Sequence, residues 1–93
     1  MPKILIYKKL IFFFFAGDIN ERGHLHIAKS KDFSRVAKIW FENGVEIFEK
    51  GSLTQKELTE AKKIVEKNKD FIITQWNNFK KQGAVKLKQI NKL

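Results

Sequence analysis

Two histidines separated by a single residue form the densest group of chemically useful side chains in this 93-residue sequence. The segment His24-Leu25-His26 alternates polar and apolar residues, which is typical of a strand. Side chains two residues apart in a strand point to the same face, so the two imidazoles are expected side by side. Imidazoles change protonation near neutral pH and can both give and take protons. We therefore predict that His24 and His26 form an acid–base pair displayed to solvent on one strand face.

Three cations follow the histidines closely in the sequence. Lys29, Arg35 and Lys38 are predicted to bind phosphate beside the pair, which makes RNA the expected substrate class. On a regular strand Arg35 and Lys38 point to opposite faces, so the two can line one groove only with the help of the preceding loop.

Two further interpretations of the histidine pair stay open. In the first, both rings are structural, half-buried at the start of the strand and bonded to backbone carbonyls of the preceding loop. In the second, His24 and His26 bind a divalent metal, with Asp18 or Glu21 from the loop as a third ligand. The sequence has no cysteine, which excludes thiolate zinc sites and cysteine nucleophiles. Our prediction includes no metal and no cofactor.

The positive charge is concentrated at the two ends of the chain. Nineteen basic and ten acidic side chains give a net charge of +9. Residues 1–17 contribute +3 and residues 80–93 contribute +5, whereas residues 18–79 hold eleven basic and ten acidic side chains. Basic ends attract phosphates or an acidic protein, more weakly as the salt concentration increases. The same lysines also serve simply to keep a small, aromatic-rich domain in solution.

The first half of the chain predicts an antiparallel β-meander. Apolar runs separated by turn residues indicate five strands, at residues 4–7, 10–15, 24–28, 35–41 and 45–48. The second of these contains four consecutive phenylalanines and is apolar on both faces, so it is expected in the middle of the sheet, covered on both sides. Asn43-Gly44 is typical of the tight turn of a hairpin.

Helical spacing replaces strand alternation in the second half of the chain. Thr54 is expected to cap a helix and Glu57 to close the capping box. An apolar stripe runs from Thr54 to Gln82 and is interrupted near Asn68, which predicts a helical pair or one kinked helix. The predicted fold class is therefore α+β, with an antiparallel β-meander of about five strands followed by a helical pair packed on one face.

A chain of this length forms one domain. We assign residues 1–83 to a single α+β domain and residues 84–93 to a basic C-terminal tail or an extra strand. Trp40 and Trp76 are predicted core residues. The longest uncharged apolar run, Leu10 to Ala16, is shorter than the roughly 20 residues that cross a bilayer. We expect a cytoplasmic protein without membrane association, and no pattern in the sequence indicates an oligomeric state.

The order of these features resembles the bacterial family catalogued as domain of unknown function 4160. Three segments carry the resemblance: the loop Asp18-Ile19-Asn20 before His24-Leu25-His26, the strand Ala37-Lys38-Ile39-Trp40-Phe41, and the helix start Thr54-Gln55-Lys56-Glu57-Leu58 with the later Trp76-Asn77-Asn78-Phe79. The terminal segment from Leu87 to Leu93 is also similar to the family's tail. The sequence departs from the family where prolines often precede the histidines, since it has Glu21-Arg22-Gly23 there.

The resemblance implies a toxin-like component of a two-gene toxin–antitoxin module, paired with a small antitoxin protein, and it implies no particular activity. We therefore expect a small basic bacterial protein that acts on RNA or on a partner protein. The alternative is a non-enzymatic interaction module, for a protein or DNA, in which His24 and His26 are structural. Imidazoles that are buried and bonded to the backbone favour this alternative.

Overall fold

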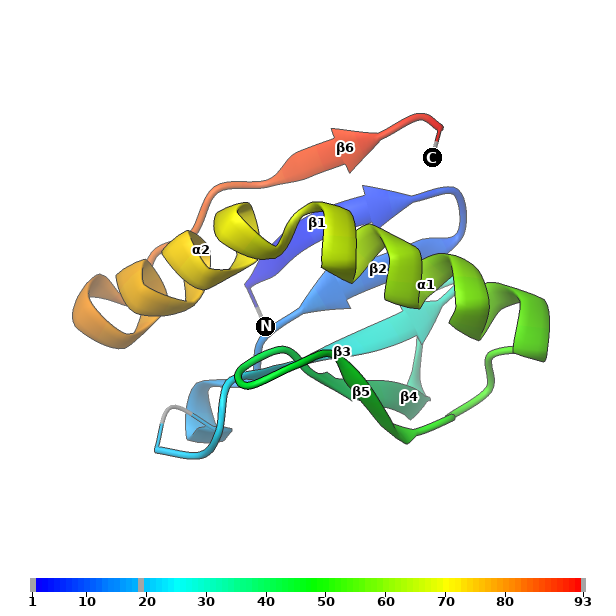
Figure 1. Cartoon of the computed structure of the whole chain (residues 1–93), viewed down its shortest axis with the longest axis horizontal. Coiled ribbons are helices and arrows are strands. Elements are labelled where there is room, and N and C mark those ends of the chain that lie inside the picture. Colours follow the sequence, from blue (N-terminus) through cyan, green and yellow to red (C-terminus); the bar gives the residue numbers. More distant parts are fainter. Residues whose placement is uncertain (1, 19, 93) are drawn as a thin grey trace.

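One mixed sheet and two helices make up the protein (Figure 1). The computed structural model describes residues 2–18 and 20–92, and the side chain of Asp18 lies outside the described part. In chain order, the elements are β1 (Lys3–Tyr7), β2 (Leu10–Phe13), a short 3₁₀ turn (Ala16–Asp18), β3 (His24–Lys29), β4 (Asp32–Trp40), β5 (Glu46–Glu49), α1 (Gln55–Lys67), α2 (Lys69–Gln82) and β6 (Lys88–Ile90).

The sheet has the strand order β5-β4-β3-β2-β1-β6. Strands β1 to β5 pair with their chain neighbours in antiparallel fashion, as the meander requires. The last strand, β6, returns to the far edge and pairs parallel to β1, with Leu5 opposite Lys88 and Tyr7 opposite Ile90. The predicted α+β class, meander and helical pair are confirmed. Residues 84–93 were predicted to form either a basic tail or an extra strand, and Lys88–Ile90 within this segment form the sixth strand.

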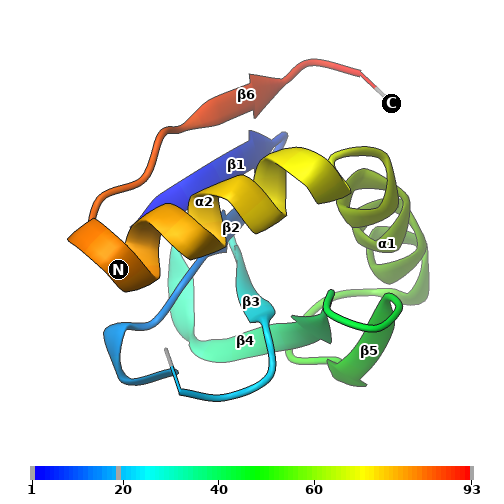
Figure 2. The ribbon, with the colours of Figure 1, turned by 60° about the vertical axis from the view of Figure 1, so that its left-hand side comes forward.

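Both helices lie on the same face of the sheet (Figure 2). The capping box at the start of α1 is formed as predicted, because the Thr54 hydroxyl accepts from the Glu57 N–H and the Glu57 carboxylate accepts from the Thr54 N–H. Asn68 separates α1 from α2, and its side-chain amide donates to the carbonyl of Ile64 at 2.8 Å. The helix α2 ends at Gly83, whose φ of 71° is the left-handed conformation that glycine adopts readily.

The main core fills the space between the helices and the sheet. Phe12, Ile39, Ile64 and Trp76 are among its buried side chains. A second, smaller cluster lies on the opposite face, because successive residues of a strand point to opposite sides. This second cluster consists of Ile11, Phe13 and Ala28, with Phe15, Phe33 and Val36 packed against it. Strand β2 is therefore buried on both faces, as its composition predicts.

The turn between β3 and β4 is shorter than the sequence suggested. Ser30 and Lys31 have φ values of 53° and 63°, the left-handed pair that closes a two-residue hairpin. Strand β4 consequently starts at Asp32 rather than Arg35, and its register with β3 shifts between Ile27 and Lys29. No helix in the described residues is long and apolar enough to cross a membrane.

Candidate functional site

His24 and His26 are neighbours on β3, with ring centres 5.1 Å apart. Both are buried, since His24 is 1% exposed and His26 is 8% exposed. The prediction that β3 displays this pair to solvent is therefore wrong. The physical reason is that aromatic rings close over the same strand face. The His26 ring lies 5.7 Å from the Phe13 ring and 4.4 Å from the Phe15 ring.

His24 is fixed by a hydrogen bond to the loop that precedes it. Its Nδ1 atom lies 2.7 Å from the backbone oxygen of Arg22. A carbonyl oxygen can only accept, so Nδ1 carries the proton and donates in this bond. The ring also packs against Trp40 at 5.0 Å and Trp76 at 6.0 Å between ring centres. His24 thus has the backbone contact that the structural interpretation expects.

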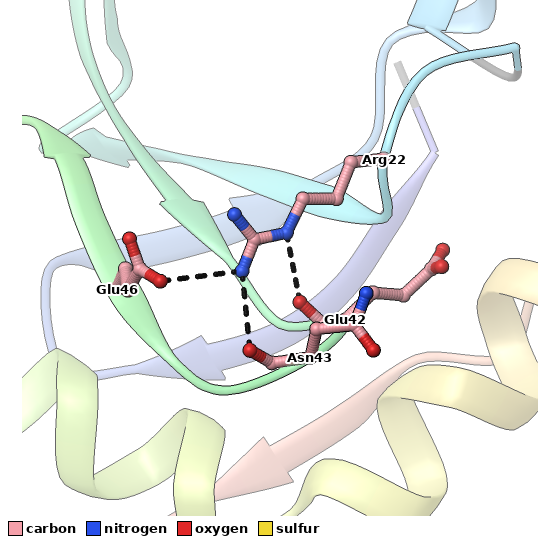
Figure 3. A network of polar contacts seen from close by, with 4 residues as sticks. All are labelled: Arg22, Glu42, Asn43 and Glu46. Carbon is pink, nitrogen blue, oxygen red and sulfur yellow. Dashed lines mark hydrogen bonds and ion pairs between the residues drawn. The ribbon is translucent and has the colours of Figure 1, made fainter.

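The loop before His24 is held by the Arg22 side chain (Figure 3). Its Nε donates to the Glu42 carbonyl at 2.8 Å, and one terminal nitrogen donates to the Asn43 carbonyl and the Glu46 carboxylate, both at 3.4 Å. Glu42 and Asn43 belong to the connection between β4 and β5, and Glu46 is the first residue of β5. Arg22 therefore anchors the loop that leads to the histidines.

Gly23 completes this attachment through its backbone. Its N–H donates to the Glu42 carboxylate at 2.8 Å, and its carbonyl accepts from the Phe41 N–H at 3.0 Å. A methyl group on Gly23 would lie 2.8 Å from the ring of Phe41 and would also collide with the Glu42 carboxylate. The close approach of the loop to the end of β4 therefore requires glycine here.

The three predicted phosphate-binding cations do not come together. Lys29 pairs with Glu57 of α1 at 3.0 Å, on the helix side of the sheet. Lys38 belongs to the opposite face and lies 3.8 Å from Glu21. Arg35 is exposed on β4, and its backbone oxygen accepts from the Ser52 N–H at 3.1 Å. Phosphate binding by these residues stays a prediction, and two of the three have a carboxylate partner.

The structure describes the side chain of only one of the two third ligands suggested for a metal at the histidines. Glu21, one of the two suggested third ligands, has its carboxylate beside Lys38. The other, Asp18, has a side chain outside the described part of the chain. Across residues 2–18 and 20–92, no group of three or more histidine and carboxylate side chains is arranged to hold a metal.

A surface that sequence reasoning missed lies beside the buried histidines. We call it the aromatic patch, and it consists of Arg22, Lys38, Trp40 and Phe48. The Lys38 ammonium lies 4.5 Å from the centre of the Trp40 ring and 5.0 Å from that of Phe48. The Arg22 guanidinium lies 5.2 Å from the Trp40 ring. Such distances are those of cation–π contacts, so the four side chains stabilise one another.

Trp40 is only half-buried, so its assignment to the core is wrong, whereas Trp76 is 1% exposed and its assignment is confirmed. The sequence places Trp40 in an apolar strand. It does not show that the sheet face on which Trp40 lies is left without a covering helix. Next to it on β5, Phe48 is 64% exposed, although its ring centre is 5.5 Å from that of Trp40. No pattern in the predicted strand 45–48 indicates that Phe48 is exposed, because its exposure follows from the position of β5 at the edge of the sheet.

The cations of the aromatic patch are largely balanced by carboxylates. Arg22 pairs with Glu46 at 3.4 Å, and Lys38 lies 3.8 Å from Glu21. Strand β5 itself carries Glu46 and Glu49 on the outside of the sheet. The patch therefore combines exposed aromatic surface with a nearly neutral local charge.

The aromatic patch adjoins a free edge of the sheet. Strand β5 is the last strand on its side, and all four of its residues are exposed. In the described residues no strand pairs with its outer edge. An unpaired edge offers a row of backbone donors and acceptors that another extended chain can use.

Fold and site together define the class of protein. It is a small α+β domain with both helices on one face of the sheet, two buried histidines in β3 and an aromatic patch on the other face. The profile of the family described as Domain of unknown function (DUF4160) matches residues 10–77, from β2 into α2. The chain therefore belongs to the DUF4160 family, as the resemblance indicated. No curated protein and no solved structure matches it.

Proposed function

We propose that this protein is a non-enzymatic interaction module that binds a small partner protein through the aromatic patch and the outer edge of β5. The observation that carries the proposal is the exposed ring of Phe48, held against Trp40 and Lys38 at the edge of the sheet. Tryptophan and arginine dominate binding energy at protein interfaces, and both are present in the patch.

The geometry of the patch favours tight binding because its side chains are already ordered. Arg22 is fixed by three hydrogen bonds, and Lys38 lies between two aromatic rings. A surface that is ordered before binding loses less side-chain entropy when the partner arrives. A partner strand that pairs with β5 would also gain main-chain hydrogen bonds along Glu46–Glu49.

Charge supports a protein rather than RNA at this surface. The carboxylates of Glu21 and Glu46 offset the two cations, and Glu49 adds a further negative charge. A polyanion is repelled by such a strand. A second copy of β5 is also disfavoured, because each copy carries two glutamates and strands of like charge repel one another. The charge therefore favours a partner strand in which basic residues flank apolar ones.

The rival function is cleavage of RNA with His24 and His26 as acid and base. A general acid or base has to come within hydrogen-bonding distance of its substrate. Exposures of 1% and 8%, and the bond from His24 to the Arg22 carbonyl, support a structural role for the pair instead. In the toxin–antitoxin module that the family resemblance implies, the small partner is the product of the second gene.

The test is direct binding of this chain to the product of the reading frame adjacent to its own gene, measured by calorimetry. Phe48→Ala removes the exposed ring and is expected to weaken binding at least about 30-fold, the effect of losing an interface hot spot. Leu87→Ala is the matched control, because Leu87 is 55% exposed and lies next to β6, at the other edge of the sheet.

The control variant is expected to bind within about twofold of the unmodified chain. Neither substitution touches the core, so circular dichroism should show both variants folded. Equal affinity of Phe48→Ala and the unmodified chain, or failure of the unmodified chain to bind the neighbouring gene product, contradicts the proposal.

A further inference from the structure

A second surface gathers lysines from α1 and the C-terminal segment. A groove of about 290 Å³ runs between β6 and the junction of α1 with α2. Three lysines line it, Lys67 from α1, Lys88 from β6 and Lys92 beyond β6. Asn68, Gln89 and Asn91 also line the groove. We call this surface the basic groove.

Lys88 is held in the groove by neutral groups. Its ammonium donates to the Asn68 side-chain oxygen at 2.8 Å and lies 5.5 Å from the centre of the Phe71 ring. Asn68 is itself fixed by its bond to the Ile64 carbonyl. An amide and an aromatic ring orient the cation without neutralising it, so the full charge of Lys88 is available to a ligand.

Carboxylates are missing from the groove lining among the described residues. The three ion pairs formed by described side chains involve Arg22, Lys29 and Lys38, all elsewhere in the protein. Beyond the groove, Ile90 is opposite Tyr7 and the exposed Lys8-Lys9 turn follows Tyr7 directly. Glu57 and Glu60 lie beside this turn, so the charge without a nearby carboxylate is that of the groove itself. Figure 1 shows this turn beside the C-terminal end of β6.

We propose that the basic groove binds the phosphodiester backbone of a nucleic acid. Lys88 and Lys92 follow one another along the extended chain of β6 and beyond it, with Lys67 opposite them, which matches a linear ligand with regularly repeated negative charge. Lysine, asparagine and glutamine side chains are common donors to phosphate oxygens. The groove is independent of the aromatic patch, so this inference does not rest on the proposed function.

The lining also determines what kind of recognition the groove provides. The lining contains no aromatic side chain in the described part of the chain, so bases have no surface on which to stack. It also contains no arginine, the residue that best matches a carboxylate or a guanine edge in two-point contacts. Contacts are therefore made to the backbone, and binding is expected to be independent of base sequence and strongly dependent on salt.

The experiment measures fluorescence anisotropy of a labelled RNA of about 16 nucleotides, with duplex DNA and polyglutamate as parallel probes. The double variant Lys88→Gln/Lys92→Gln removes two groove cations. The matched control, Lys62→Gln/Lys63→Gln, removes the same charge from another side of α1, where both lysines line a separate depression with Glu66. Each protein is titrated between about 50 and 200 mM salt.

The groove variant is expected to bind nucleic acid about tenfold more weakly at low salt, with a shallower salt dependence, while the control stays within about twofold. The RNA and DNA arms show which nucleic acid is preferred. Phe48→Ala should bind nucleic acid like the unmodified chain, which separates this test from that of the proposed function. The proposal is overturned if the groove variant and the control variant lose the same affinity for nucleic acid. It is also overturned if the unmodified protein binds polyglutamate as tightly as RNA.

Discussion

The backbone oxygen of Arg22 lies 2.7 Å from Nδ1 of His24, so one residue joins the buried histidines to the exposed aromatic patch. Arg22 uses its carbonyl to orient His24 and its guanidinium to bind the turn between β4 and β5. The same guanidinium lies over Trp40. His24 therefore packs beneath the aromatic patch, and the binding proposed for this patch would depend on His24 through Arg22 rather than through contact with a ligand.

Replacing His24 should lower stability. His24→Ala leaves a cavity beside Trp40 and Trp76 and an unpaired Arg22 carbonyl, so we expect the free energy of unfolding to fall by about 2–4 kcal/mol. His24→Asn places an amide N–H near the position of Nδ1 and should restore about 1 kcal/mol of this loss. Urea unfolding measures both changes. If His24→Ala is as stable as the unmodified protein, the ring is not structural.

A methyl group at Gly23 should destabilise the protein, whereas one at Gly17 should not. Gly23→Ala forces the methyl against the buried Phe41 ring and the Glu42 carboxylate, at an expected cost of about 1–3 kcal/mol. A methyl group on Gly17 meets no atom within 4 Å, so Gly17→Ala should stay within about 0.5 kcal/mol. Thermal unfolding compares the two variants. Equal melting temperatures of Gly23→Ala and Gly17→Ala would contradict the close packing around Gly23.

The guanidinium fork of Arg22, rather than its charge alone, should hold the loop. Arg22→Lys keeps the cation but cannot reach the Glu42 and Asn43 carbonyls with the same geometry. We expect Arg22→Lys to increase amide hydrogen exchange in residues 20–23 nearly as much as Arg22→Ala. Full protection of the loop in Arg22→Lys would show that a single positive charge is sufficient.

Glu57 should make stability depend on pH. Its bond from the Thr54 N–H, with the nearby Lys29 ammonium, holds the pKa of Glu57 below its ordinary value of 4.5. A carboxyl with a lowered folded pKa stabilises the protein above its unfolded pKa, and this stabilisation is lost as the pH falls through the folded value.

Glu57→Gln keeps an oxygen for the capping box but removes the charge. The variant should therefore be less stable than the unmodified protein at pH 7, and the difference should shrink below pH 4.5. Urea unfolding at pH 7 and at a pH below 4.5 measures this difference in the free energy of unfolding. A difference that stays constant with pH would mean that the charge of Glu57 contributes nothing to folding.

Local patterns predicted most of the elements. The alternation of His24-Leu25-His26 and the Thr54–Glu57 capping box depend on neighbouring residues, and both are formed. Asn43 and Gly44 have positive φ, but Trp40 pairs with Glu46, so the connection spans residues 41–45 and is longer than the tight turn predicted. The predicted strands left residues 29–34 for the turn after β3, whereas Ser30-Lys31 alone form it, because neither residue is typical of a left-handed turn. The parallel pairing of β6 with β1 joins the two ends of the chain, and no local pattern encodes such a contact.

The candidate site was predicted less well because burial depends on distant residues. Alternation places His24 and His26 on one face, but it does not show that Phe15 and Phe33 help to cover that face. Phe33 packs there only because the register of β4 shifts against β3. Likewise, the exposure of Trp40 and Phe48 follows from the position of β5 at the edge of the sheet.

Amide hydrogen exchange of the protein in complex with the neighbouring gene product tests the central claim most directly. If a partner strand pairs with the edge of the sheet next to the aromatic patch, amides within Glu46–Glu49 gain protection on binding. Residues 88–92 of the basic groove should exchange at the same rate in the free and bound protein. Unchanged exchange in β5, with new protection confined to residues 88–92, would contradict the account.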